Sequence, residues 1–275
     1  MKKLLLASFT FGALIAPAAA ADMPIKAPRY VAPPPTWSGF YAGLNAGWVD
    51  SQNSLSTVAT PTPDAALGVI PGVSEGLAAL SSGSIPAGSR SGFIGGGQIG
   101  YNWQLGSLVA GIEADIQGLS QSGGAGSVTT TAVVVGVPVT STQTASLSTK
   151  YLGTVRGRLG LLLTPTWLVY ATGGLAYGGV DASTSLVQSG TNGFVGTGAG
   201  SLSDTRAGWA AGGGVEWMFA QRWSAKGEYL HYDLGTSSFA SASTSGFFAT
   251  PVYQNVLSSA HFEGNLVRAG VNYHF

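Results

Sequence analysis

The amino-acid sequence predicts an all-β fold in which eight antiparallel strands form a barrel. Eight segments alternate apolar residues with polar or small ones at a period of two, which is the pattern of half-buried strands and not of helices. The connections between these segments alternate between short and long. Charged residues make up only 9% of the 275 residues, and 42 residues are glycine, so the chain lacks the charged surface of an ordinary soluble domain.

The last segment shows the alternation most clearly, because its apolar residues Val267, Val271 and Phe275 all fall on odd positions. Arg268 and Asn272 fall on the even positions between them. Successive side chains of a strand point to opposite faces, so one face is apolar and the other polar. The predicted strands are residues 37–49, 92–103, 108–119, 151–163, 167–180, 205–219, 223–233 and 262–275.

The lengths of the connections extend this prediction to a transmembrane barrel. Short connections span residues 104–107, 164–166 and 220–222, and long ones, nearly free of charge, span 50–91, 120–150, 181–204 and 234–261. An even number of strands with short turns at one end and long loops at the other is typical of bacterial outer-membrane barrels. We therefore expect short periplasmic turns, four long extracellular loops and both termini in the periplasm.

Aromatic residues gather near the predicted strand ends, as expected at the two interfaces of a membrane. The periplasmic ring would contain Trp37, Phe40, Trp103, Trp167, Phe219, Trp223, Tyr273 and Phe275. The outer ring would contain Trp48, Phe93, Tyr151, Tyr177, Trp209 and Tyr229.

The N-terminus has the features of a secretory signal peptide over residues 1–20. Lys2 and Lys3 precede an apolar run, and alanines follow at the expected cleavage site after Ala20, with Ala21 as the alternative. Residues 21–36 contain five prolines and are expected to form an extended periplasmic leader. The barrel domain would then occupy residues 37–275.

If the apolar faces meet lipid, the opposite faces carry charged side chains into the barrel. An eight-stranded barrel is just wide enough for side chains to fill, and an unpaired buried charge is costly. We expect a salt-bridge plug that closes the interior. The alternative is a small-solute porin lined by Arg156, Arg158 and Arg268. The nine residues predicted to face inward are Glu113, Asp115, Arg156, Arg158, Arg206, Glu216, Lys226, Glu228 and Arg268.

Other classes of function find little support in the sequence. The 12 basic residues are balanced by 12 acidic ones without a basic patch, so no nucleic-acid partner is expected. Cysteine is absent and the three histidines lack metal-ligand spacing. We expect no cofactor, no metal site and no catalytic residue.

Two short motifs resemble enzyme signatures but lie in the wrong context. Gly95, Gly97 and Gly100 match a dinucleotide motif, yet they fall inside a predicted strand. Ser74 lies in a Gly-x-Ser-x-Gly match within a segment predicted as a loop. A third possibility is a lipid-modifying hydrolase at the outer rim, for which the candidate residues are Ser258, Ser259, His261 and Glu263.

The chain also resembles a known family. The resemblance rests on segments near the N-terminus, in the strands and at the C-terminus. They are Ala20-Ala21-Asp22-Met23-Pro24, Trp37-Ser38-Gly39-Phe40-Tyr41-Ala42-Gly43 with Asn45, Gly47 and Trp48, residues 92–102, Arg156 with Arg158, Glu228-Tyr229 and the terminal Phe275. The chain is similar to the outer-membrane immunogenic protein family, among the small OmpA-like and opacity-like barrels.

The resemblance implies an eight-stranded barrel that supports the envelope and displays surface loops, and not an enzyme. The terminal Phe275 resembles the signal that the barrel-assembly machinery reads, so that machinery is an expected partner during biogenesis. Outer-membrane lipid is the other expected partner, and the chain is expected to be a monomer or a weak homo-oligomer.

Overall fold

The computed structural model describes residues 36–64, 68, 70–121, 125–247 and 250–275. The expected signal peptide and all but the last residue of the expected leader lie outside these residues. The described elements are β1 (Gly39–Pro61), α2 (Val73–Ser81), β2 (Gly83–Leu105), β3 (Leu108–Gln121), β4 (Ala125–Val134), β5 (Val137–Thr164), β6 (Trp167–Gly190), β7 (Val195–Ala220), β8 (Trp223–Phe247) and β9 (Thr250–His274).

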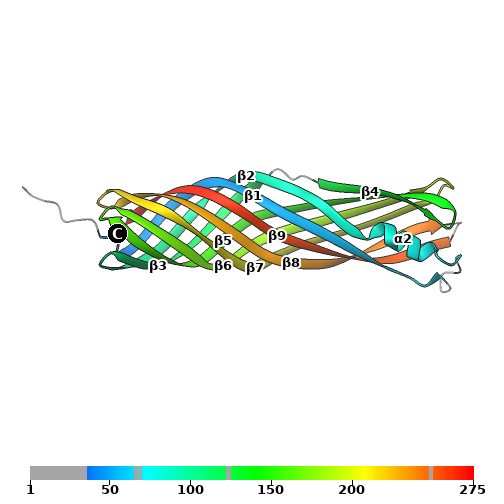
Figure 1. The fold of residues 1–275 in the computed structure, drawn as a ribbon, viewed down its shortest axis with the longest axis horizontal. Helices are drawn as coiled ribbons and strands as arrows, with labels where there is room; N and C mark the ends of the chain where they lie inside the picture. The colour runs from blue at the N-terminus through cyan, green and yellow to red at the C-terminus, as the bar shows by residue number, and fades with distance from the viewer. Residues whose placement is uncertain (1–35, 65–67, 69, 122–124, 248–249) are drawn as a thin grey trace, which may run out of the picture. The chain divides into compact units, whose positions relative to one another are not determined.

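Eight of the strands close into a ring. The order β3-β2-β1-β9-β8-β7-β6-β5 returns to its start through pairing between β3 and β5, and each neighbouring pair is antiparallel. The labels in Figure 1 follow this path around the wall. The predicted eight-stranded antiparallel barrel is confirmed. Closure gives every strand two partners, so the ring has no free edge along its shared length.

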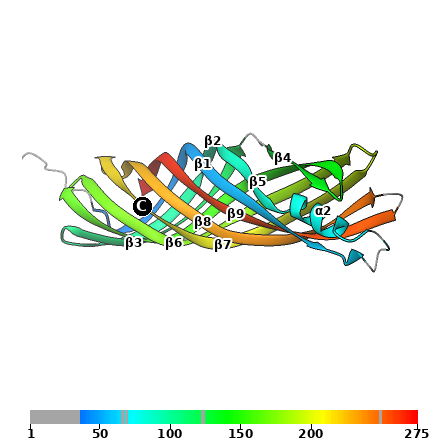
Figure 2. The same cartoon turned by 45° about the vertical axis from the view of Figure 1, so that its right-hand side comes forward.

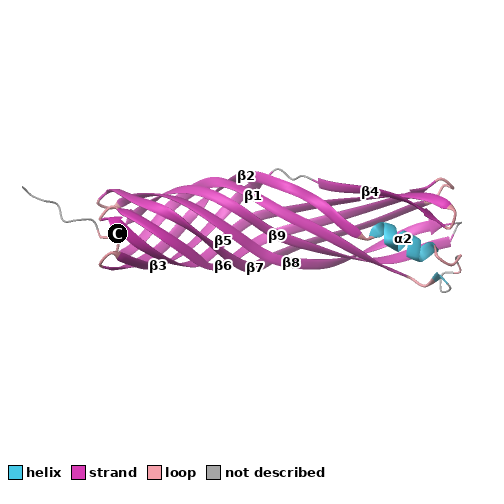
Figure 3. Cartoon of the chain, in the orientation of Figure 1, coloured by secondary structure: helices cyan, strands magenta, loops and turns pink. Residues whose placement is uncertain are grey.

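β4 is not among the strands predicted from the sequence. It pairs with the outer part of β5 through the turn at residues 134–137 and lies outside the eight-stranded ring. Figure 3 shows it as a separate strand above the outer half of the barrel. Thr and Val dominate it, and such β-branched residues favour extended backbone.

The four long connections predicted as loops are instead mostly strand, and this part of the prediction was wrong. β1 continues to Pro61 with alternating buried and exposed residues from Ser51 to Thr60. The outer parts of β5 to β9 likewise extend the wall toward the end of the barrel that holds α2 (Figures 1 and 2). Ser and Thr in alternation suit a wall whose backbone groups are satisfied by the ladder. We call these continuations the outer tube.

The outward face of the barrel wall between the short turns and the outer tube is apolar. Leu44, Ile99 and Leu159 are among its most exposed side chains, and exposed aliphatic residues of this density need a non-aqueous environment. Aromatic residues border the band at both ends, as predicted. The exposed ones at the short-turn end are Phe40, Trp103, Trp167, Phe219, Trp223 and Phe275, and those at the opposite border are Trp48, Phe93, Trp209 and Tyr229.

Trp37 departs from this arrangement. It was predicted in the periplasmic ring, but it is completely buried against Val109, Leu168, Tyr170 and Met218. Its indole Nε1 donates a 3.0 Å hydrogen bond to the carbonyl of Pro165, and its backbone N–H donates to Gln104 Oε1. A buried indole N–H needs such a partner, and turn carbonyls at the barrel mouth provide one. Trp37 therefore closes the short-turn end of the lumen.

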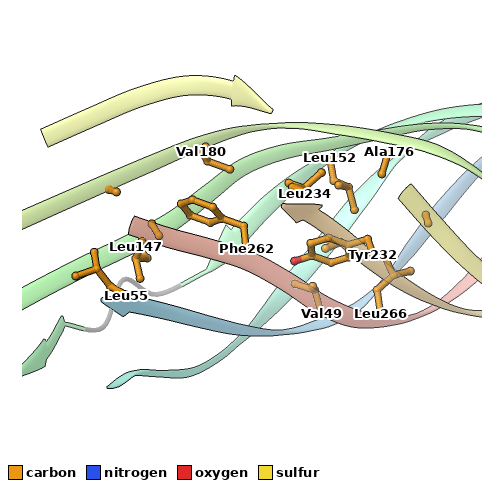
Figure 4. Close-up of a cluster of buried hydrophobic side chains, with 14 of the residues drawn as sticks. Val49, Leu55, Leu147, Leu152, Ala176, Val180, Tyr232, Leu234, Phe262 and Leu266 are labelled. Atoms are coloured by element: carbon orange, nitrogen blue, oxygen red, sulfur yellow. The ribbon is translucent and has the colours of Figure 1, made fainter. Parts of the chain in front are cut away.

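A cluster of apolar side chains fills part of the interior of the outer half. Figure 4 shows Val49, Tyr232 and Phe262 converging with leucines from neighbouring strands. The Tyr232 hydroxyl is satisfied by the hydroxyl of Ser51 at 2.8 Å. This cluster separates the membrane-level lumen from the space beside α2.

α2 lies in a segment predicted as a loop. Val73, Leu77 and Leu80 follow the i, i+4, i+7 spacing of one helical face, but the segment is only nine residues long and contains a glycine and two serines, which are weak helix formers. Val73, Leu77 and Leu80 of α2 pack on Val139 of β5 and Val252 of β9. No helix in the described part of the chain is long and apolar enough to cross a membrane.

Candidate functional site

Charged side chains gather inside the barrel at the level of the apolar band. The register places acids directly opposite bases on neighbouring strands: Glu113 faces Arg156, Glu216 faces Lys226, and Glu228 faces Arg268. Opposite charges at directly paired positions stabilise a sheet. The alternation of each strand turns these side chains to the lumen. The charge network comprises Glu113, Asp115, Arg156, Arg158, Glu216, Lys226, Glu228 and Arg268.

Arg156 lies at the centre of the charge network. Its Nη2 is 2.7 Å from Glu113 Oε1 and 2.9 Å from Asp115 Oδ2, while its Nη1 is 3.1 Å from Glu228 Oε1. Its side chain is completely buried. Three carboxylates around one guanidinium use its fork of donors well.

Arg268 and Lys226 complete the balance of charge. Arg268 Nη2 is 2.8 Å from Asp115 Oδ2, and its Nε donates to Glu228 Oε2 at 2.6 Å. Lys226 Nζ lies 2.8 Å from both carboxylate oxygens of Glu113. The network thus holds four acids and four bases, so its formal charge is zero.

Two tyrosines missed by sequence reasoning line the same network. The Tyr41 hydroxyl donates to Glu113 Oε2 at 2.7 Å and accepts from Arg158 Nη1 at 3.1 Å. The Arg158 guanidinium lies 4.2 Å from the centre of the Tyr170 ring, a cation–π contact. The alternation in the sequence could have indicated both tyrosines, because each falls on the lumen-facing positions of its strand.

Arg206 does not belong to the charge network, and its predicted place there was wrong. It lies in β7 at the base of the outer tube, ten positions from Glu216, or roughly 33 Å at about 3.3 Å per residue. Its Nη2 donates to the backbone carbonyl of Thr236 at 2.7 Å. Pairing between β7 and β8 is interrupted from Ala199 to Trp209, so Arg206 satisfies a carbonyl that the ladder leaves free.

The candidate hydrolase residues form no linked set among the described residues. Ser259 bonds to Ser238 through their hydroxyls, whereas His261 Nδ1 faces Thr236. His261 Nε2 lies 3.6 Å from Glu263 and 3.7 Å from Asp233. Ser258 is completely buried on the opposite face.

The two sequence motifs also find structural explanations. Gly95, Gly97 and Gly100 lie within β2 and not between a strand and a helix. Ser74 lies in the first turn of α2 and is completely buried, so its hydroxyl faces no open surface. Within the described residues, no group of three or more His, Cys, Asp or Glu side chains has the geometry to hold a metal ion.

The protein forms a closed eight-stranded ring with an apolar outer band, aromatic borders and a buried neutral charge network. The family described as "Outer membrane protein beta-barrel domain" matches residues 6–275 of the chain. The chain belongs to this family. It is an integral protein of the outer membrane of a Gram-negative bacterium, with the short turns and both ends of the barrel chain in the periplasm and the outer tube outside the cell.

The chain is also similar in sequence to outer-membrane proteins of other bacteria. The 31 kDa outer-membrane immunogenic protein of Brucella melitensis is 33% identical over 285 residues and matches over the full length of both chains. The 22 kDa outer membrane protein of Rhizobium leguminosarum is 30% identical over 53% of this chain and 58% of its own. The solved structure of OprG from Pseudomonas aeruginosa covers 88% of this chain and 99% of that one, at 11% identity and a TM-score of 0.37.

Proposed function

We propose that this barrel is a closed, non-enzymatic structural protein of the outer membrane that carries a rigid tube to the cell surface. The charge network is the observation that supports the proposal. Its eight charged side chains come from five of the eight strands and pair across the lumen at 2.5–4.0 Å. Charges paired this closely leave no continuous row of one sign for an ion to follow.

Two further layers support the same proposal. The apolar cluster around Phe262 fills the lumen on the outer side of the charge network, and Trp37 fills it on the periplasmic side. Apolar side chains packed across a pore exclude water as well as ions. A porin would need all three layers to open together.

Conductance of the folded protein tests the proposal directly. The mature chain is refolded in detergent, checked for a heat-modifiable band on a gel, and added to a planar bilayer. We expect folded protein without steady channels. Steady open channels in the wild-type protein would contradict the proposal and favour the small-solute porin. In that case, Arg156, Arg158 and Arg268 would be the residues to neutralise in a selectivity assay.

We also propose that the terminal residue directs assembly. Phe275 is 74% exposed at the periplasmic border, next to Tyr273 at a ring distance of 5.2 Å, so its side chain is free for the assembly machinery to bind. Deletion of Phe275 should lower the amount of folded protein in the outer membrane. Refolding of the same variant into detergent should be unchanged, and a loss there would indicate a folding role instead.

A further inference from the structure

α2 lies at the far end of the outer tube, among strands that come from different parts of the ring (Figure 2). Its apolar residues contact Val134 of β4, Val139 of β5 and Val252 of β9, in a cluster separate from the main apolar cluster. The helix is nine residues long and would not be stable alone in water. Its position therefore depends on the wall.

Neutral side chains of the wall hold the C-terminal carbonyls of α2. Gln188 Nε2 donates to Leu77 O at 3.1 Å, Gln143 Nε2 donates to Leu80 O at 3.1 Å, and Thr57 Oγ1 donates to Ser81 O at 3.0 Å. The last four carbonyls of a helix have no partner within it, and the bonds from Gln143 of β5 and Thr57 of β1 satisfy those of Leu80 and Ser81. Gln188 of β6 adds a second donor to the Leu77 carbonyl, which also accepts from Ser81 Oγ.

The lumen beneath α2 is polar, unlike the cluster below it. We call this space the outer chamber; a cavity of about 10 Å³ remains in it, lined in part by Thr57, Gln143, Ser243 and Ser258. The hydroxyls of Ser243 and Ser258 are buried and have no hydrogen-bond partner within the described part of the chain. Buried groups left without partners favour any state in which water reaches them.

Glycines with positive φ stand at both ends of α2. Gly72 caps its start at a φ of 91°, and Gly83 follows its end at a φ of 155°. A Cβ atom on Gly83 would meet nothing within 4 Å, and the residue forms the last pair of the β1–β2 ladder, where it faces Thr57. Such positions absorb backbone rotation when a neighbouring element moves.

We propose that α2 is a hinged lid on the outer tube, and that its release from the wall opens the outer chamber to external water. The surface that α2 covers is rich in hydroxyl and carboxamide groups, which hydrate readily. The apolar cluster around Tyr232 and Phe262 stays in place and forms the floor of the opened chamber. The inference does not depend on whether the charge network closes the membrane-level lumen.

Cysteine labelling of the full mature protein in liposomes tests the proposal, because the natural chain contains no cysteine. Ser243→Cys places a near-isosteric thiol in the outer chamber, where Ser243 is 1% exposed. Leu234→Cys lies lower on the inner face of the same strand and is 0% exposed, while Thr244→Cys is an exposed reference. A membrane-impermeant maleimide is added outside.

We expect Ser243→Cys to react at least tenfold faster than Leu234→Cys and more slowly than Thr244→Cys. Adding Gln188→Leu removes the bonds to Leu77 O and Ser81 Oγ and should raise the Ser243→Cys rate roughly tenfold. Gln52→Leu makes the same change at an exposed position of β1 and should leave the rate unchanged.

Three results would contradict the proposal that α2 is a lid. One is a Ser243→Cys rate no higher than that of Leu234→Cys. Another is a Ser243→Cys rate that Gln188→Leu does not change, which would mean that reagent enters by a route other than release of α2. The third is an equal rise at both thiols in Gln188→Leu, which would indicate global unfolding. Amide hydrogen exchange of α2 in the wild-type protein provides a check free of any substitution.

Discussion

Glu216 accepts a 2.6 Å hydrogen bond from Arg158 Nη2, and the two side chains are 0% and 2% exposed. Ser224 and Asn272 donate to the other carboxylate oxygen of Glu216. The carboxylate is therefore fully satisfied, and Arg158 depends on it for compensation of its charge inside the membrane.

Removal of one member of this pair should be strongly destabilising. Glu216→Leu leaves Arg158 without its close carboxylate, and we expect a loss of about 3–5 kcal/mol in the free energy of unfolding. Urea titration in lipid vesicles, followed by the gel shift of folded protein, measures this loss. The double variant Arg158→Met/Glu216→Leu should regain at least half of it. A loss below about 1 kcal/mol in the single variant would contradict the importance of this pair.

Arg206→Met provides the matched control for the pair. Arg206 was expected in the same interior, but its side chain is 33% exposed and its near carboxylate, Asp204, lies at 3.8 Å. We expect a change within about 1 kcal/mol in the same titration. A loss as large as that of Glu216→Leu would place Arg206 in a cooperative network after all.

Trp37→Ala should weaken the periplasmic end of the barrel. Removing this completely buried indole leaves a cavity beside Leu168 and Met218, with an expected cost of about 3–5 kcal/mol in unfolding free energy. Trp103→Ala, at a 48% exposed position in the same border, should cost clearly less. Equal losses would mean that Trp37 acts only as an interfacial anchor.

Gly100→Ala tests the packing of Tyr41 against the wall. A Cβ atom at Gly100 would lie 2.4 Å from the Tyr41 ring, so it would displace the hydroxyl that bonds Glu113. We expect a loss of about 1–3 kcal/mol. Gly118→Ala is the control, since a Cβ there meets nothing within 4 Å. Urea titration of both variants should separate them.

Acid should loosen α2 through Asp64. Burial raises the pKa of the Asp64 carboxyl, but hydrogen bonds from Ser74 and Gly72 outweigh this and hold the pKa below its ordinary value. A lowered folded pKa means that the stabilisation is complete above the unfolded pKa of about 3.9 and is lost as the pH falls through the folded value. Hydrogen exchange over residues 72–81, corrected for intrinsic rates, should accelerate below about pH 4.

Asp64→Asn separates this effect from general acid unfolding. The amide cannot titrate, so the additional acceleration below pH 4 should disappear while exchange at neutral pH becomes faster. If the wild-type and Asp64→Asn proteins showed the same pH profile, the carboxylate cap would not control α2.

The membrane-level part of the structure could be predicted well from sequence, because lipid outside and packed charges inside impose a strict alternation. Residues 151–163, for example, fall within β5 and place Arg156 and Arg158 in the lumen. The strands of the outer tube were harder to predict, because Ser and Thr occur in loops and in strands alike. The inward turn of Trp37 depends on the Pro165 carbonyl, a tertiary contact that no local pattern encodes.

The continuation of the strands into the outer tube has a consequence for evolution at the cell surface. Backbone ladders hold this part together, so outward side chains such as Ser56 and Ser185 contribute little to its shape. Substitutions at such positions usually change stability by less than about 0.5 kcal/mol. The part of the barrel outside the cell can therefore drift in sequence while its architecture persists.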